Sequence, residues 1–185
     1  MQFLKRNYGW MIVIVIAVLP MIPLFKEILS DTPDEDMLYH ISGEFAIRWM
    51  TAVLTLTPFF ILFGVTNLFV RQAMGISTAI WSLLHFSIFL IHEGILDVFT
   101  ELSFILGFLA LLMMLPLLLT SNRRSMRRLK ANWKKLQRLA YLIGVLGLLH
   151  VILLNKTWLV YTIIVILGFV LRLPAVRKKV IQIRS

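Results

Sequence analysis

Cysteine is absent from this chain of 185 residues. The absence excludes disulfides, iron–sulfur clusters and thiolate-ligated haem, because each of these requires a cysteine sulfur. The sequence also contains no His-Glu-x-x-His metal motif, no Gly-rich phosphate loop and no nucleophile elbow. Thiol chemistry is therefore excluded, and no known loop for a nicotinamide cofactor is present.

Long apolar runs are abundant. The chain is 59% hydrophobic, whereas soluble domains average about 45–50%. The excess lies in six runs, each near the length that crosses about 30 Å of hydrocarbon. We therefore predict an all-α, multi-pass membrane protein with one six-helix transmembrane domain. The predicted spans are 10–25, 46–69, 74–95, 102–119, 136–154 and 158–171.

The first run follows Lys5 and Arg6, as in a signal peptide, but no small-x-small cleavage site comes after it. We expect an uncleaved first helix, followed by a solvated outer loop over 26–45. Acidic residues are few, with 9 Asp and Glu against 19 Lys and Arg, and apart from Glu93, two residues before the end of the third, none lies inside a predicted span.

The basic residues predict the orientation. If both termini are cytoplasmic, every lysine and arginine except Lys26, Arg48 and Lys156 lies on the cytoplasmic side. The basic linker 120–136 and the basic tail 172–185 then lie at the inner membrane surface. The net charge of +10 is explained by contact with anionic membrane lipid, so it gives no reason to expect nucleic-acid binding. A docking face for a soluble electron donor is the alternative interpretation of the linker.

Two histidines lie deep within separate spans. His85 comes 14 residues after Arg71, and His150 comes 12 residues after Arg138. A rise of about 1.5 Å per residue in two helices of the same direction puts both imidazoles roughly 20 Å from the inner surface. Ionisable groups at this depth are costly and mark functional sites. Two imidazoles at matched depth suit a six-coordinate haem iron, although a lone histidine could instead bond a neighbouring helix.

Small and polar residues share the faces that carry these histidines. Steps of three and four predict that they point into the bundle. The glycines before His150 would leave a groove for a flat macrocycle, or would merely allow close helix packing. We interpret His92, near the outer rim, as a contact for a haem propionate rather than a ligand. The predicted metal ligands are His85 and His150, and the other predicted cofactor contacts are Ser82, His92, Gly144 and Gly147.

These residues resemble the ferric-reductase-like transmembrane family, and within it the short bacterial branch that forms the haem-binding membrane subunit of the periplasmic methionine-sulfoxide reductase system (the MsrQ/YedZ type). The resemblance runs from about Ser42 to Trp158. Its motifs are Ser42-Gly43, Thr57-Pro58, Arg71-x-x-x-Gly75, Leu84-His85, Leu119-Thr120-Ser121, Trp133-x-x-Leu136 and Leu149-His150.

The resemblance implies a six-helix bundle in a bacterial inner membrane, with haem b held by His85 and His150. The family usually has a further histidine thirteen residues before the second ligand, but this chain has Gln137 there, so we predict one haem. Members of the branch take electrons from a cytoplasmic flavin reductase or quinone and pass them to an extracytoplasmic molybdenum reductase subunit. The resemblance also implies FMN as a further candidate cofactor. Larger relatives carry a fused flavin and nicotinamide domain, which this chain lacks.

The favoured hypothesis is a membrane cytochrome b that moves electrons outward, as an electron-transfer subunit rather than a self-contained enzyme. The alternative is a small transporter or assembly subunit without haem, which would use the histidines for protons or packing and would be colourless. Against this alternative, no acidic residue lies in the middle of a predicted span to partner the histidines, and proton pathways usually need such groups.

Overall fold

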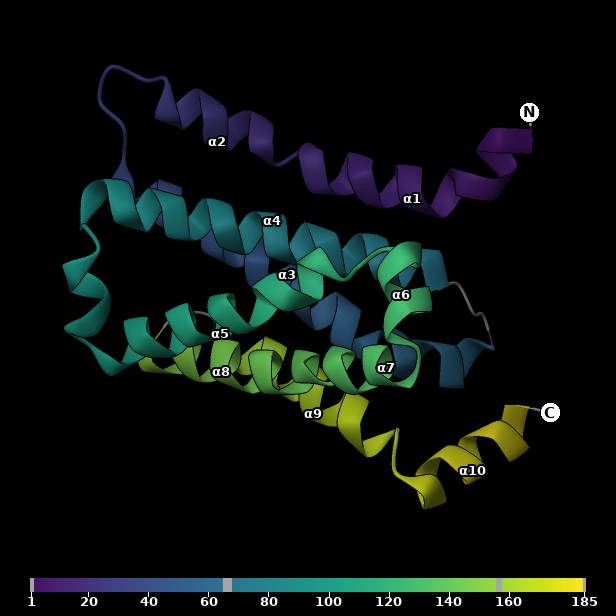
Figure 1. The fold of residues 1–185 in the computed structure, drawn as a ribbon. Coiled ribbons are helices and arrows are strands. Elements are labelled where there is room, and N and C mark those ends of the chain that lie inside the picture. The colour runs from purple at the N-terminus through teal and green to yellow at the C-terminus, as the bar shows by residue number, and fades with distance from the viewer. Residues whose placement is uncertain (1, 65–67, 156–157, 185) are drawn as a thin grey trace.

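The computed structural model describes residues 2–64, 68–155 and 158–184, and all regular elements within these ranges are helices (Figure 1). The all-α prediction is therefore confirmed. The elements are α1 (Gln2–Val18), α2 (Met21–Ile28), α3 (Glu35–Phe63), α4 (Leu68–His92), the 3₁₀ turn η1 (Leu96–Phe99), α5 (Leu102–Leu119), α6 (Arg123–Leu129), α7 (Ala131–Gln137), α8 (Leu139–Leu153), α9 (Trp158–Val170) and α10 (Pro174–Arg184).

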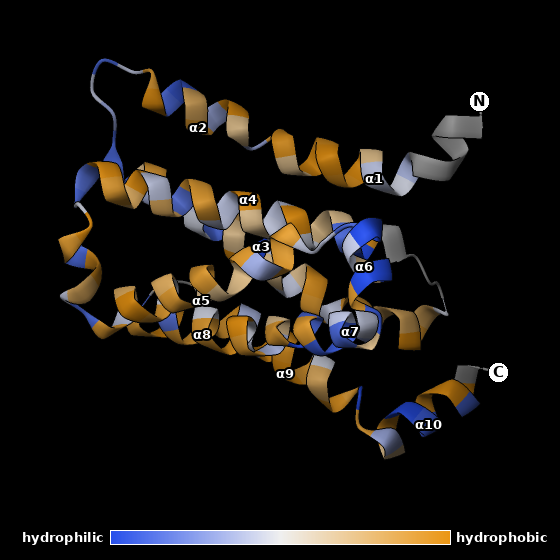
Figure 2. Ribbon diagram, viewed as in Figure 1, coloured by the Kyte–Doolittle hydropathy of each residue, from blue (hydrophilic) through white to orange (hydrophobic). Residues whose placement is uncertain are grey.

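Five stretches of the described chain are long and apolar enough to cross a membrane: Tyr8–Ile28, Glu35–Phe63, Val70–His92, Leu102–Leu119 and Ala131–Leu153. A sixth is obtained only if α9 and α10, which meet at a bend of 83°, count as one span. The 13 residues of α9 rise only about 20 Å at about 1.5 Å each. Many large apolar side chains are exposed on these helices, whose residues are mostly hydrophobic (Figure 2), and such a surface suits lipid rather than water. The protein is a multi-pass membrane protein.

The predicted outer loop 26–45 is wrong except at residues 29–34, because α2 continues to Ile28 and α3 begins at Glu35. Helix α3 begins at Glu35, where the Asp34 side chain accepts a hydrogen bond of 3.3 Å from the Met37 amide. This cap and the acidic first turn stabilise the helix start. These first turns were not predicted because their residues are polar, although they belong to a helix whose middle is apolar. The correction places His40 and Glu44 on a helix instead of in a loop.

Two other predicted spans differ from the structure at breaks in the helices. The first is divided between α1 and α2 at Leu19 and Pro20, because proline lacks the amide proton needed inside a helix. The second predicted span should end earlier. Helix α3 stops at Gly64, whose φ of 73° is left-handed, and this conformation favours glycine. The rest of that span falls partly on 65–67, outside the described residues, and then on the start of α4.

Helix α3 lies at the centre and packs against α4, α8 and α9, while α5 packs against both α4 and α8. One buried cluster fills the space among α3, α5 and α8 and includes Met50, Leu54 and Ile143. A second joins α1, α3 and α4 around Trp81, whose indole N–H donates to the Ala17 carbonyl at 3.1 Å. Helices α3, α4, α5 and α8 therefore surround the middle of the molecule.

The two ends of the bundle differ in charge. The start of α1, the short helices α6 and α7, and α10 lie at one end, while the α2–α3 connection and η1 lie at the other (Figure 1). Both ends carry hydrophilic residues (Figure 2), but those of α6, α7 and α10 are mostly arginine and lysine, whereas the α2–α3 connection contains Asp31 and Asp34. The basic linker and the basic tail thus share one end of the molecule.

Candidate haem site

His85 on α4 and His150 on α8 line the same cavity, which has a volume of about 320 Å³ and is bounded by α3, α4, α5 and α8. Their ring centroids lie 6.5 Å apart, with an angle of 71° between the ring planes. Metal–imidazole bonds of about 2 Å, plus about 1 Å from each nitrogen to its ring centre, place opposed rings roughly 6 Å apart. The separation therefore has room for one metal ion between the two rings.

The hydrogen bonds of Ser42 select the tautomer of His85. The Ser42 hydroxyl is buried and donates to the Leu38 carbonyl at 2.7 Å, which uses its only proton. The same oxygen lies 2.9 Å from His85 Nδ1, so it accepts a hydrogen bond from Nδ1–H. This arrangement leaves the lone pair of His85 on Nε2, where it is free to bind a metal.

His150 has the same tautomer for a different reason. Its Nδ1 lies 2.7 Å from the backbone carbonyl of Ser103, in the first turn of α5. A carbonyl only accepts hydrogen bonds, so Nδ1 must carry the proton. His150 thus also keeps its lone pair on Nε2. Outer hydrogen bonds of this kind fix the orientation of metal-ligating imidazoles.

Two glycines that the sequence analysis did not select allow these contacts. A Cβ atom at Gly107 would lie 2.9 Å from His150 Nδ1, and one at Gly43 would lie 3.1 Å from His85 Cε1. Real Cβ atoms essentially never approach closer than 3.0 Å. Each imidazole therefore occupies space that a side chain on the facing helix would fill. The sequence signal for both residues was weak, since each is a single glycine without a partner glycine nearby.

The predicted cofactor contacts fall into two groups. Ser82 and Gly147 line the cavity with the two histidines. Gly144 does not line the cavity. It packs against Leu54, whose Cδ1 would lie 2.6 Å from a Cβ atom added at position 144. His92 also lies outside the lining, and its Nδ1 is 3.0 Å from Glu35 Oε1. The geometry supports helix packing for Gly144 and an ion pair at the start of α3 for His92.

Acidic residues are closer to the histidines than expected. Glu44 lies within the membrane-spanning length of α3 and lines the cavity. The expectation that no acid lies within a span is therefore wrong, because α3 is longer than its apolar run. His40, Asp36 and Glu93 line the cavity as well, and all three are exposed.

The donor set suits a porphyrin iron better than a metal ion held by protein alone. Within the described ranges, no group of three or more His, Cys, Asp or Glu side chains could hold a metal ion. A haem needs only two axial protein ligands, because the porphyrin supplies the other four. The cavity walls are mainly apolar and aromatic, with contributions from Phe86, Phe89, Phe104 and Phe108. The residues present thus fit a flat, largely apolar macrocycle.

Replacing Ser42 by alanine should weaken haem retention without removing an axial ligand. The change deprives His85 Nδ1 of its acceptor, and loss of such an outer partner typically lowers metal affinity by about 10–100-fold. The measurement is competitive transfer of haem from the purified protein to apomyoglobin. Ser87→Ala, which changes a serine of α4 outside the cavity lining, is the matched control and should transfer haem at close to the wild-type rate. Equal transfer rates for the two variants would contradict the role of Ser42.

Comparison with known proteins gives a consistent family match. The model of the family described as "Ferric reductase like transmembrane component" matches residues 42–148. Several relatives bear the name "Protein-methionine-sulfoxide reductase heme-binding subunit MsrQ". That of Agrobacterium fabrum (strain C58) is 33% identical over 150 residues, which cover 74% of this chain and 70% of the relative.

Two further relatives carry the same name. The protein of Rhizobium meliloti (strain 1021) is 36% identical over 118 residues, covering 60% of this chain and 55% of the relative. The protein of Deinococcus radiodurans is 41% identical over 119 residues, covering 60% and 59%. The chain thus spans between about half and 70% of the length of these relatives. No solved structure gives a significant match. Because the family model covers more than half of the residues, this chain belongs to the ferric-reductase-like transmembrane family.

Proposed function

We propose that the chain is a membrane electron-transfer subunit that holds one haem b between His85 and His150. The observation that carries the proposal is the pair of imidazoles, 6.5 Å apart between centroids in one cavity, each with Nδ1 bonded to an oxygen acceptor. The relatives named as heme-binding subunits support the same function. A bound haem would supply one-electron redox chemistry.

The residues around the cavity have distinct roles in this proposal. His85 and His150 would hold the haem through Nε2, while Ser42 and the Ser103 carbonyl orient the two rings. Because two imidazoles would ligate the iron, the bound haem would favour electron transfer over oxygen binding. The aromatic side chains of α4 and α5 exclude water from the apolar part of the cavity. Gln137, which takes the place of the family's further histidine, has a buried Nε2 with no hydrogen-bond partner in the described chain, and we propose no ligand role for it.

We further propose that both termini, with the basic linker 120–136 and tail 172–185, face the cytoplasm. His85 and His150 then lie nearer the extracytoplasmic side, because α4 ends at His92 and α8 ends at Leu153. Electrons would enter from a cytoplasmic flavin reductase or quinone, with FMN as a candidate carrier. They would leave toward an extracytoplasmic acceptor, which the names of the relatives suggest is a methionine-sulfoxide reductase subunit.

One observation favours the alternative of a transporter or assembly subunit without haem. Glu44 places a carboxylate beside the cavity that holds both histidines, and intramembrane acids are typical of proton pathways. The two functions predict different colours for the purified protein. Only the haem protein would show a reduced-minus-oxidised difference spectrum.

We expect the protein, purified in detergent from haem-replete membranes, to contain one haem b per chain. The reason is that, within the described chain, His85 and His150 are the two histidines of the cavity whose rings lie close together, 6.5 Å apart between centroids. The measurement combines a dithionite-reduced minus oxidised spectrum with a pyridine haemochrome assay and a protein determination. Two haems per chain would contradict the inference from Gln137, and a colourless protein would favour the alternative function.

A further inference from the structure

Glu44 is unusual among the charged residues around the cavity because it is largely buried. Its side chain is 16% exposed, whereas Asp36, His40 and Glu93 are exposed. It follows Gly43, the residue against which the His85 ring packs. An exposed charge is screened by water and salt, but a buried charge acts strongly on its surroundings. Glu44 is therefore the charged side chain of the cavity with the greatest influence on its interior.

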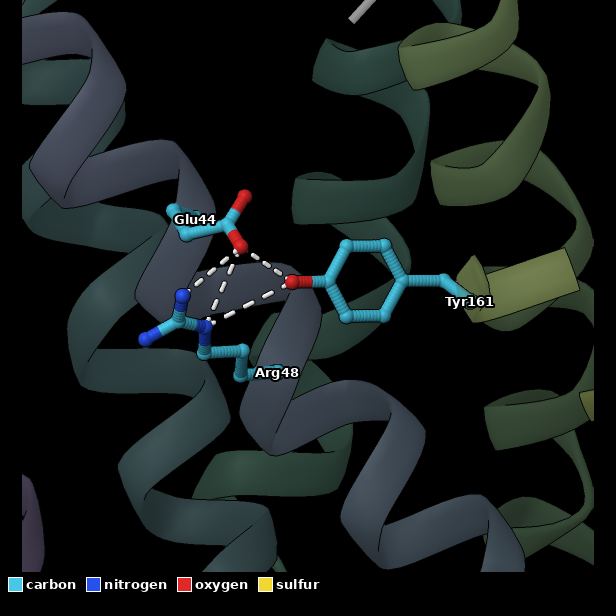
Figure 3. A network of polar contacts seen from close by, with 3 residues as sticks. All are labelled: Glu44, Arg48 and Tyr161. Carbon is cyan, nitrogen blue, oxygen red and sulfur yellow. Dashed lines mark hydrogen bonds and ion pairs between the residues drawn. The ribbon is translucent and has the colours of Figure 1, made fainter. Parts of the chain in front are cut away.

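Two neighbouring side chains compensate the Glu44 carboxylate through the same oxygen, and Arg48 Nε also donates to the Tyr161 hydroxyl at 3.4 Å (Figure 3). Arg48, one turn later on α3, approaches Oε1 with Nη2 at 3.0 Å and Nε at 3.1 Å. The Tyr161 hydroxyl on α9 also donates to Oε1. Glutamate four residues before arginine is the favourable order for such a helical pair. The phenol adds a donor from a second helix, which ties α9 to the wall of the cavity.

The two charges are not equivalent with respect to the cavity. Arg48 is 53% exposed in its side chain and is not among the lining residues, whereas Glu44 lines the cavity. The guanidinium also lies over the Phe45 ring, 5.0 Å from its centroid, which holds it at the outer surface of α3. The interior of the cavity therefore experiences mainly the negative charge of Glu44, reduced by a more distant and more hydrated positive charge.

We propose that the Glu44–Arg48 pair, with Glu44 held in place by Tyr161, sets the reduction potential of the haem, which makes these three positioning residues. This inference rests on the proposed function. Reduction adds one electron to the iron and removes one positive charge. A nearby carboxylate favours the oxidised form, so Glu44 lowers the potential, and Arg48 opposes it by neutralising part of that charge.

The test is a spectroelectrochemical titration of the haem in the detergent-purified, full-length protein. Glu44→Gln keeps the size of the side chain and removes the charge. It should raise the ratio of reduced to oxidised haem at a fixed potential by about tenfold, which is about 59 mV for a one-electron couple. Arg48→Gln should change the ratio in the opposite direction by roughly threefold, a smaller effect because an exposed charge is screened. The double variant should lie between the two.

Three further variants separate charge from structure. Glu44→Asp keeps the charge but shortens the side chain, so its potential should remain nearer the wild type than that of Glu44→Gln. Tyr161→Phe changes no charge. It should lower the unfolding temperature and leave the potential closer to that of the wild type than Glu44→Gln does. Asp31→Asn removes an exposed carboxylate from the loop before α3, outside the cavity lining, and should leave the potential unchanged.

The outcomes distinguish this inference from the proposed function. A wild-type protein without haem would refute the function itself. A haem-loaded protein whose potential is the same in Glu44→Gln, Arg48→Gln and Asp31→Asn would refute only the role of the pair. If Glu44→Gln does not retain haem, the shift in Arg48→Gln decides the question. A lower potential supports the inference, and an unchanged or higher potential overturns it.

Discussion

His85→Ala and His150→Ala should each yield a folded protein with at least about tenfold less haem per chain than the wild type. Each substitution removes one of the two imidazoles that face each other in the cavity. The iron would then have a single protein ligand, and the cavity would admit water beside it. The measurement is the haemochrome assay, normalised to protein, together with the oxidised and reduced absorption spectra.

His92→Ala provides the comparison for these two variants. His92 is on the same helix as His85 but is exposed and pairs with Glu35 outside the cavity lining. Its loss should leave a bis-imidazole spectrum and a normal haem content. The predicted contact between His92 and a propionate would appear at most as a small change in the potential. An unchanged bis-imidazole spectrum in His85→Ala would show that His85 is not an axial ligand.

The transmembrane architecture was predictable where an apolar run coincides with a helix. Helix α5 occupies Leu102–Leu119, as predicted, because Glu101 and Thr120 interrupt the apolar run on each side. Helix α3 was predicted incompletely. Its first turns, Glu35–Phe45, are polar, and hydropathy measures lipid contact rather than helix length. The backbone hydrogen bonds that continue a helix past its apolar run leave no apolar signal in the sequence.

The candidate site was predictable at the level of its two histidines but not of its acids or of the groups that support the histidines. Matched depth identified His85 and His150, because helix geometry converts sequence distance into position. The partner of His150 is a backbone carbonyl at Ser103, which any residue would offer. Ser42 was noted only as part of a motif, and its role depends on the packing of α3 against α4. Contacts between helices of this kind are not encoded in any single run of residues.

A methyl group at position 107 should disrupt the site almost as strongly as the loss of a ligand. In Gly107→Ala the new Cβ would lie 2.9 Å from His150 Nδ1 and 3.0 Å from Cε1. The obstacle is fixed to the backbone of α5, so the imidazole has to move and its hydrogen bond to the Ser103 carbonyl is lost. We expect a reduction in haem affinity of about 10–100-fold, the usual cost of losing an outer partner of a metal ligand.

Gly75→Ala is the matched control, since it adds the same methyl group to another membrane-spanning helix. There the nearest atom, Val53 Cγ2, lies 4.0 Å from the new Cβ, which is an ordinary contact. Alanine is favoured over glycine within a helix by about 1 kcal/mol, so both substitutions should strengthen their helices locally. Haem transfer to apomyoglobin should therefore accelerate in Gly107→Ala and remain near the wild-type rate in Gly75→Ala. If Gly107→Ala kept its haem as firmly as Gly75→Ala, His150 could not be held against α5 in the haem-loaded protein, and its orientation would have to come from another contact.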